Sequence, residues 1–113
     1  MKWFLNSKIH GAVVTEAELD YKGSITIDVE LMEKSGLEKG EKVLVVSEDT
    51  GSRLETYVIE GERDSGNIKV NGPASKKISK GETVIIMGFK LSEEPVEATK
   101  ITVDKENKFK EHI

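Results

Sequence analysis

The stretch Tyr21-Lys22-Gly23-Ser24-Ile25-Thr26-Ile27-Asp28 combines a short strand pattern with a Gly-Ser pair at the start of that strand. Polar and apolar residues alternate from Ser24 to Asp28, which predicts a strand with Ser24, Thr26 and Asp28 on one face. Glycine opens backbone conformations closed to other residues, and the serine places a hydroxyl beside the Gly23 carbonyl. If that bond is strained, the hydroxyl can attack it and cut the chain. Gly-Ser is also a common turn dipeptide, so the pair alone does not decide between a turn and self-cleavage.

Outward from this stretch, the chain is predicted to form short strands separated by turns. The first strand is expected over residues 2–15, with Lys8 and His10 on one face and Ile9 on the other. Further strands are expected at residues 42–47, 53–60, 67–70, 83–89 and 101–103. Recurrent turn signals and the scarcity of helices predict a small closed β-barrel.

Several local signals give finer expectations. Asp28 is placed to cap a short helix that ends at Ser35, and Pro73 is placed to start a helical turn. Residues 83–89 form an apolar run without alternation, which predicts a strand buried on both faces. The tail from Asp104 is charged and is expected to be frayed.

Composition limits the class of protein. The chain has 113 residues, 36% of them hydrophobic and 34% charged, which predicts one soluble domain with a small core. Such a core is often supplemented by contacts between subunits. The net charge of -4 argues against a nucleic-acid-binding surface, and the absence of cysteine excludes disulfides and thiolate chemistry. The apolar run near the N-terminus is too short for a signal peptide or a membrane span, so a cytoplasmic protein is expected.

One further pair of side chains is a candidate for a binding site. Arg53 and Tyr57 share one face of the strand predicted at 53–60, about 13 Å apart along it, whereas Thr56 faces the other way. The planar fork of Arg53 suits a carboxylate. An exposed arginine, a half-buried tyrosine and a lone His10 are also ordinary structural features. No acidic or histidine cluster has metal-ligand spacing, and no nucleotide-binding fingerprint is present.

Several motifs occur together in one order and spacing. They are Ser7-Lys8-Ile9-His10, the stretch from Tyr21 to Asp28, Thr50-Gly51-Ser52-Arg53, Thr56-Tyr57-Val58-Ile59, Val70-Asn71-Gly72 and Gly81-Glu82-Thr83-Val84-Ile85-Ile86. In this combination the chain resembles the pyruvoyl-dependent aspartate 1-decarboxylases over nearly its whole length. Separate motifs in register are far more specific than any one of them.

The resemblance implies a mainly β fold, a six-stranded double-psi β-barrel with short helices in a single domain over residues 1–113. It also implies a homotetramer with active sites between neighbouring subunits. Ser24 would attack the Gly23 carbonyl, with assistance from Thr56 and Asn71. The products would be a β-chain of residues 1–23 and an α-chain of residues 24–113, and Ser24 would become an N-terminal pyruvoyl group.

The same resemblance implies the reaction. L-aspartate would form a Schiff base with the pyruvoyl group and lose its α-carboxylate, and β-alanine, a pantothenate precursor, would be released. Lys8 and Arg53 match carboxylate-binding residues, and Tyr57 matches the proton donor. The remaining matched positions are Thr56, Asn71 and Gly72 in substrate binding, and His10 and Tyr21 in the pocket lining. Neither a metal nor pyridoxal phosphate is expected.

Several questions stay open from sequence. Thr56 and Tyr57 are adjacent, so a regular strand cannot aim both at one pocket; a bulge, separate roles in two steps, or a pocket between subunits would each resolve this, and the last two are favoured. Gly11, Glu55, Pro73 and Ser75 depart from the common family residues. The competing functions are a non-catalytic β-barrel that binds or regulates, and decarboxylation of another amino acid such as glutamate.

Overall fold

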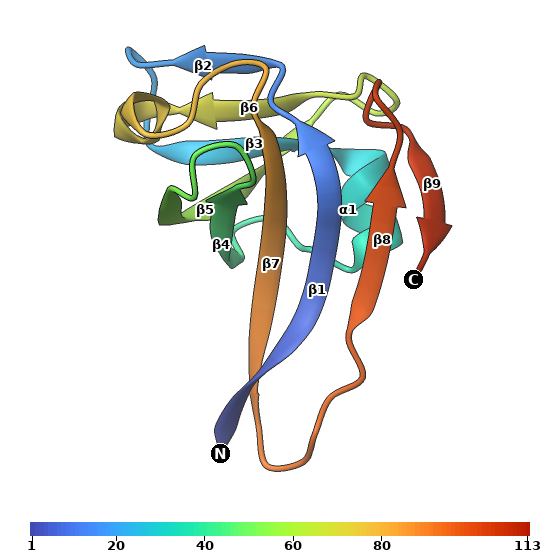
Figure 1. Cartoon of the computed structure of the whole chain (residues 1–113). Coiled ribbons are helices and arrows are strands. Elements are labelled where there is room, and N and C mark those ends of the chain that lie inside the picture. Colours follow the sequence, from blue (N-terminus) through green and yellow to red (C-terminus); the bar gives the residue numbers. More distant parts are fainter.

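The computed structural model describes residues 1–113, and its strands dominate the chain (Figure 1). The strands are β1 (Lys2–Val13), β2 (Glu16–Glu18), β3 (Ser24–Asp28), β4 (Lys42–Ser47), β5 (Arg53–Gly61), β6 (Ile68–Asn71), β7 (Thr83–Ser92), β8 (Thr99–Val103) and β9 (Phe109–His112). The helices are α1 (Val29–Ser35) and the 3-10 helix η1 (Gly72–Lys76). The predicted mainly β class with short helices is confirmed.

The strands form one sheet in the order β2-β6-β3-β5-β4-β7-β1-β8-β9. The six strands β6, β3, β5, β4, β7 and β1 stand consecutively in this order and make up the predicted barrel, whereas β2, β8 and β9 extend it. Beyond the end of β1, the backbone N–H of Thr15 donates to the Ile68 carbonyl at 2.8 Å. Because Ile68 begins β6, this bond connects the two ends of the six-stranded order and closes the barrel. In Figure 1, β2, β6 and β3 run across the upper ends of the long strands β7 and β1.

The core lies inside this barrel and contains 17 buried hydrophobic residues. Alternation along the strands aims one set of side chains inward, as in β1, where Ile9 is fully buried while Lys8 and His10 are half-buried on the opposite face. The expected faces of β1 are therefore confirmed. In β3, Ile25 and Ile27 point into the same core.

Helix α1 begins as the sequence predicts. The Asp28 side chain accepts a hydrogen bond from the Glu30 N–H at 2.8 Å, and Gly36 follows the helix with a φ of 82°. A left-handed residue at this position is a common helix stop and favours glycine. Strand β3 and helix α1 are thus joined directly through one capping residue.

Two local expectations are wrong. Strand β7 is not buried on both faces: Val84, Ile86 and Gly88 are buried, whereas Ile85 and Met87 are only half-buried. The tail from Asp104 is not frayed, because residues 104–108 form a turn and β9 pairs with β8. The apolar outer face of β7 becomes important for the site described below.

The C-terminal turn is fixed by a residue that the sequence did not single out. Asn107 is buried; its Oδ1 accepts the Val13 N–H at 2.8 Å, and its Nδ2 donates to the carbonyls of Val13 and Gly66 at 2.7 and 2.8 Å. The side-chain amide of Asn107 thus makes the hydrogen bonds to Val13 that a neighbouring strand would otherwise make at the end of β1. This contact ties the last part of the chain to the barrel.

Candidate active site

Ser24 and Asn71 face each other at the first position of β3. They are paired in the antiparallel ladder between β3 and β6, and Asn71 Nδ2 donates to Ser24 Oγ at 2.9 Å. The Ser24 hydroxyl donates to the Lys22 carbonyl at 3.3 Å. The sequence predicted a serine outside the core, and Ser24 does lie on the face opposite Ile25, yet only 1% of it is exposed. The hydroxyl is therefore buried and bonded on both sides.

The backbone before Ser24 lies tightly against the start of η1. Gly72 has a φ of 69°, and a Cβ atom there would lie 2.8 Å from the Gly23 nitrogen and 2.8 Å from the Tyr21 carbonyl oxygen. Both distances are shorter than real Cβ contacts, so only glycine fits at Gly72 without displacing the segment. Gly23 itself is exposed whereas Ser24 is buried, so the peptide bond between them joins an exposed residue to a buried one.

Tyr57 lies on the strand next to Ser24. Strands β3 and β5 are parallel with Ile25 opposite Val58, so continuing the register by one residue sets Ser24 opposite Tyr57. Tyr57 is 43% exposed and points away from the core, on the face that also carries Ser24. Tyr57, the predicted proton donor, therefore lies on the strand adjacent to Ser24 and on the same face of the sheet.

Thr56 lies on the other face of β5. The ladders of β5 with β3 and β4 show no register shift, so no bulge turns Thr56 toward Tyr57. The alternation of the strand sets the half-buried Thr56 toward the inside and the exposed Arg53 and Tyr57 toward the outside. Of the three resolutions left open by the sequence, the bulge is excluded.

The two predicted carboxylate-binding cations lie away from Ser24. Arg53 is four residues from Tyr57 along β5, about 13 Å at ~3.3 Å per residue. Lys8 lies on β1, which β4 and β7 separate from β5. In the other direction around the barrel, β1 meets β6 only beyond its end at Thr15, seven residues after Lys8. Neither Lys8 nor Arg53 forms an ion pair within the chain. One chain therefore presents two unpaired cations on the outside of its sheet, and neither lies beside its own Ser24.

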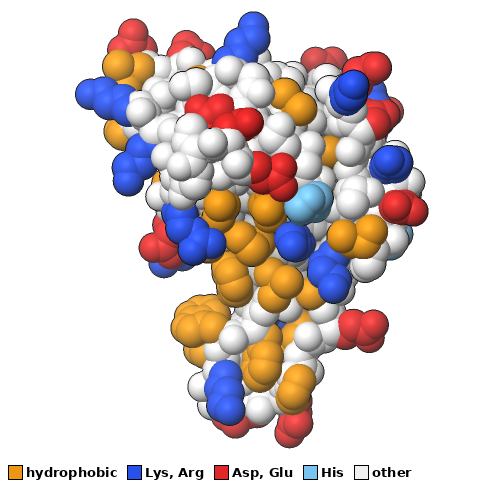
Figure 2. Space-filling model, in the orientation of Figure 1, with side chains coloured by type: hydrophobic (Ala, Val, Ile, Leu, Met, Phe, Trp, Pro, Cys, Tyr) orange, Lys and Arg blue, Asp and Glu red, His pale blue; other side chains and the backbone are white.

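A continuous apolar surface separates these groups. We call the half-buried or exposed side chains of Leu44, Val46, Ile85, Met87 and Phe89 the outer face. Cross-strand pairs join it to both cations, because Lys8 pairs with Met87, Met87 with Leu44, and Val46 with Arg53. Figure 2 shows hydrophobic side chains gathered over this part of the molecule, with a histidine and basic side chains at its edge.

Two further residues modify the charge of this surface. His10 lies beside Lys8 on β1 and forms a 3.4 Å contact with the Glu48 carboxylate, with 42% of the His10 side chain exposed. Glu55, one of the departures from the family residues, pairs with Lys42 at 3.0 Å. A hollow of about 280 Å³ on the outer face is lined by Trp3, Lys42, Val43, Leu44, Glu55 and Phe89. The negative charge of Glu55 is thus directed toward Lys42.

Tyr21 is held beside the Gly23 segment by Lys69. The Lys69 ammonium lies 5.0 Å from the centre of the Tyr21 ring and donates to Glu18 at 2.8 Å. This hydrogen bond to Glu18 raises the pKa of Lys69. Because Glu18 belongs to β2, Lys69 connects the chain on the N-terminal side of Gly23 with β6.

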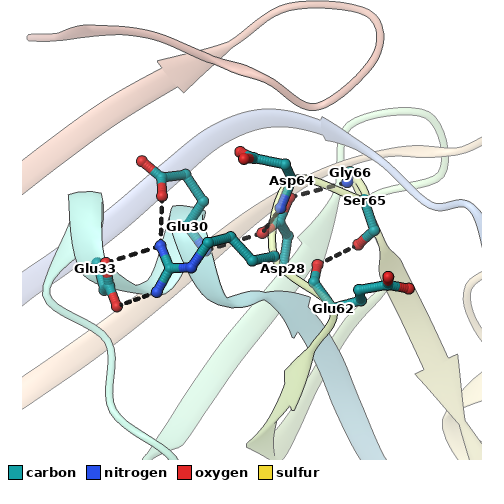
Figure 3. Close-up of polar contacts among 8 residues, drawn as sticks. Asp28, Glu30, Glu33, Glu62, Asp64, Ser65 and Gly66 are labelled. Carbon is teal, nitrogen blue, oxygen red and sulfur yellow. Dashed lines mark hydrogen bonds and ion pairs between the residues drawn. The ribbon is translucent and has the colours of Figure 1, made fainter.

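The other end of β3 is anchored at Asp28, whose buried carboxylate accepts three backbone N–H groups. The donors are Glu30 at 2.8 Å, Asp64 at 3.0 Å and Gly66 at 2.9 Å (Figure 3). Beside it, Arg63 forms ion pairs with Glu30 and Glu33, both at 2.6 Å. The sequence predicted the helix cap but not the two bonds to the turn after β5.

Sequence reasoning missed one polar contact inside the site. Asn71 Nδ2 also donates to Thr26 Oγ1 at 3.0 Å. The alternation of β3 did set Thr26 on the face of Ser24, but the register that brings Asn71 to both hydroxyls is a property of the β3–β6 ladder. The only signal available was the shared face.

Comparisons with known proteins match the chain to one family. A family model described as aspartate decarboxylase matches residues 1–110. The chain is 49% identical over 104 residues to an aspartate 1-decarboxylase of Thermotoga sp. (strain RQ2), covering 92% of this chain and 91% of that relative. It is 50% identical over 105 residues to the one of Clostridium botulinum (strain Loch Maree / Type A3), covering 93% and 76%. It is 58% identical over 87 residues to the one of Caldicellulosiruptor saccharolyticus, covering 77% and 68%.

No helix of the structure is both long and apolar enough to span a bilayer. The family model covers residues 1–110, including Ser24, Tyr57 and Asn71, and the first two relatives are 49% and 50% identical to this chain over the matched residues. The chain belongs to the aspartate decarboxylase family.

Proposed function

We propose that this protein decarboxylates L-aspartate to β-alanine and carbon dioxide by means of a pyruvoyl group made from Ser24. Membership of the family and the curated names of the relatives support the reaction. The observation that carries the mechanism is the environment of Ser24. Its hydroxyl is buried, accepts a hydrogen bond from Asn71 and adjoins an exposed Gly23.

The first step is an exchange of bonds at Gly23–Ser24. Ser24 Oγ attacks the Gly23 carbonyl carbon, the C–N bond breaks, and the amide becomes an ester with a free amine on Ser24. Removal of the Ser24 α-proton then expels the Gly23 carboxylate and ends the β-chain at residue 23. One water replaces the nitrogen of the remaining residue, which leaves a ketone and releases ammonia.

Asn71 and Gly72 are the residues that position this step. The Asn71 N–H fixes Ser24 Oγ, and the close approach of Gly72 limits where the Gly23 backbone can move. A nucleophile and carbonyl in the same short segment react intramolecularly, so positioning supplies much of the catalysis. Thr56 faces the inside of the barrel, opposite the face that carries Ser24, so nothing within one chain brings its hydroxyl to this step.

The residues around Ser24 fit a pyruvoyl group at this position. Such a group lacks the hydroxyl and amine of serine and needs hydrogen-bond donors for its oxygen atoms, and Asn71 Nδ2 is already aimed at this side chain. When formed, it supplies a carbonyl that condenses with an amine and accepts the electrons left by the departing carboxylate.

Tyr57 and the two cations would act on the substrate. The Tyr57 hydroxyl, in the row next to Ser24, would deliver a proton to the carbon that loses its carboxylate. Lys8 and Arg53 would bind carboxylates, since both are unpaired cations on the same face. His10 and Tyr21 would line the pocket.

A second copy of the chain would complete this site. Lys8 and Arg53 are too far along the sheet to meet at the serine of their own chain, and the apolar outer face lies between them. Covering this face with another subunit removes it from water and brings the cations to a neighbouring Ser24. We therefore propose the homotetramer, with active sites between subunits.

The test is a decarboxylation assay on the purified protein with aspartate and glutamate. We expect β-alanine from aspartate, no product from glutamate, and loss of activity in Ser24→Ala. Ser35→Ala is the matched control, because Ser35 is also buried and its Oγ donates to a backbone carbonyl, that of Leu31, at 2.7 Å. A fully active Ser24→Ala variant would contradict the proposal, and turnover of glutamate alone would assign another substrate.

A further inference from the structure

The carboxamide of Asn71 binds two hydroxyl groups at once. Its Nδ2 donates to Ser24 Oγ at 2.9 Å and to Thr26 Oγ1 at 3.0 Å. Ser24 and Thr26 are two residues apart on β3, so their side chains leave the strand on the same face. Both hydrogen atoms of the amide are therefore assigned, one to each hydroxyl.

The opposite end of the same carboxamide has no partner. Asn71 Oδ1 is buried and accepts no hydrogen bond, and Asn71 as a whole is fully buried. The orientation of the side chain consequently depends on the two bonds made by Nδ2. Ser24 Oγ is one of these partners, but it is also the atom that leaves its position when it attacks Gly23.

Thr26 is the partner that stays in place. It pairs with Lys69 of β6 and with Ile59 of β5, so its backbone is fixed on both sides. Its methyl group lies over Gly61, where a Cβ atom would be 3.0 Å from Thr26 Cγ2. The hydroxyl of Thr26 is thereby directed at Asn71 by a packed methyl group and two ladders.

From this geometry we propose that Thr26 is a positioning residue for self-cleavage, acting through Asn71. The bond from Asn71 to Thr26 fixes the amide so that its other N–H points at Ser24 Oγ throughout the attack. This inference rests on the proposed function, because it concerns the cleavage at Ser24. It predicts that removing one hydroxyl two residues from the cut slows the cut.

The test compares the rate at which freshly purified, uncleaved protein splits into two chains, measured by mass spectrometry over time. Thr26→Val keeps the methyl group over Gly61 and removes only the hydroxyl. We expect cleavage about tenfold slower, the effect of losing one hydrogen bond of ordinary strength. Thr26→Ser, which retains the hydroxyl, should cleave within about twofold of the unaltered chain, on the same reasoning.

Thr102→Val is the matched control. Thr102 Oγ1 is buried on the barrel and has no hydrogen-bond partner, so the same chemical change there removes no bond. We expect the unaltered cleavage rate and an undiminished melting temperature. A Thr26→Val variant that melts normally but cleaves slowly would separate positioning from a general loss of stability.

Two results would overturn the inference while the proposed function stands. Thr26→Val could cleave as fast as the unaltered chain, or Thr26→Ser could be as slow as Thr26→Val, which would show that the hydroxyl alone does not sustain the rate. If the unaltered chain never cleaves, the proposed function fails and this inference fails with it.

Discussion

At the scale of single residues, buried hydrogen bonds matter more here than exposed ion pairs. Asp28 is 1% exposed and accepts three backbone N–H groups, whereas the neighbouring Arg63 forms its ion pairs with about half of its side chain in water. An exposed pair contributes about 1 kcal/mol or less, because water and salt screen it. Buried donors left without an acceptor cost about 1–3 kcal/mol each.

We therefore expect Asp28→Ala to lower the free energy of unfolding by about 3 kcal/mol, since it removes a helix cap and orphans two further N–H groups. Arg63→Ala should lower it by less than about 1 kcal/mol. Chemical denaturation with urea measures both, with the exposed Asp20→Ala as control. Equal losses for Asp28→Ala and Arg63→Ala would contradict this ranking.

Asn107 provides a second test at this scale. Replacement by Asp keeps the acceptor for the Val13 N–H but removes the two donations to the carbonyls of Val13 and Gly66. Asn107→Asp should therefore destabilise the protein, by about 2 kcal/mol or more. Asn107→Gly retains a residue suited to the φ of 59° but loses all three bonds, so it should destabilise further. A stability equal to that of the unaltered chain in either variant would refute this role.

At the scale of elements, the C-terminal turn makes stability depend on pH. The N–H groups of Lys108 and Glu106 donate to Asp104 Oδ1 at 3.0 and 2.9 Å, and these bonds, led by the one from Lys108, lower the pKa of Asp104. A carboxyl whose pKa is lower in the folded state stabilises the protein above its unfolded pKa, near 3.8. That contribution disappears as the pH falls through the folded value.

Melting temperatures measured from pH 7 down to pH 2.5 check whether Asp104 stabilises the protein at high pH and loses this effect in acid. Both N–H groups use the same oxygen, so Asp104→Asn can keep the bonds without titrating. We expect the variant to lose less stability than the unaltered chain over the acid part of the range. An identical acid profile for the two proteins would show that Asp104 does not contribute.

The elements that sequence predicted well are those with local signals. The strand at 42–47 matches β4, and the cap at Asp28 and the helix end at Ser35 match α1. The prediction of a frayed tail was wrong because the order of the tail depends on Asn107, whose hydrogen bonds reach Val13, 94 positions away. No local pattern marks such a contact.

The candidate site shows the same division. Resemblance singled out Ser24 and Asn71, and the structure brings them into contact. Alternation correctly set Thr56 and Tyr57 on opposite faces of β5. The contact between Thr26 and Asn71, and the separation of Lys8 from the serine, depend on strand register and strand order, which the sequence did not fix.

At the scale of the whole molecule, the outer face should be an interface between copies. Met87 is half-buried at its centre, between Lys8 and Leu44. A charge placed there would be buried in the assembly, so Met87→Glu should give smaller oligomers in analytical ultracentrifugation. Lys110→Glu, on the exposed part of β9, is the control and should assemble normally. A monomeric unaltered chain, or a Met87→Glu variant that assembles fully, would contradict this interface.

Sharing of the site between copies can be tested by complementation. Chains with Ser24→Ala retain both cations but form no carbonyl, and chains with Arg53→Ala form the carbonyl but lack one cation. Each protein alone should be nearly inactive, whereas co-expressed chains should regain part of the activity because some sites combine the intact halves. No recovery in mixed oligomers would mean that each chain builds its own site.

The central claim is that the chain is cut between Gly23 and Ser24, and denaturing mass spectrometry of the purified, active protein tests it most directly. The account predicts two species, residues 1–23 and residues 24–113, whose masses add to that of the intact chain plus one water minus one ammonia, with the larger species reactive toward hydrazides. An active protein that consists only of the uncut chain, with an ordinary serine at position 24, would contradict it.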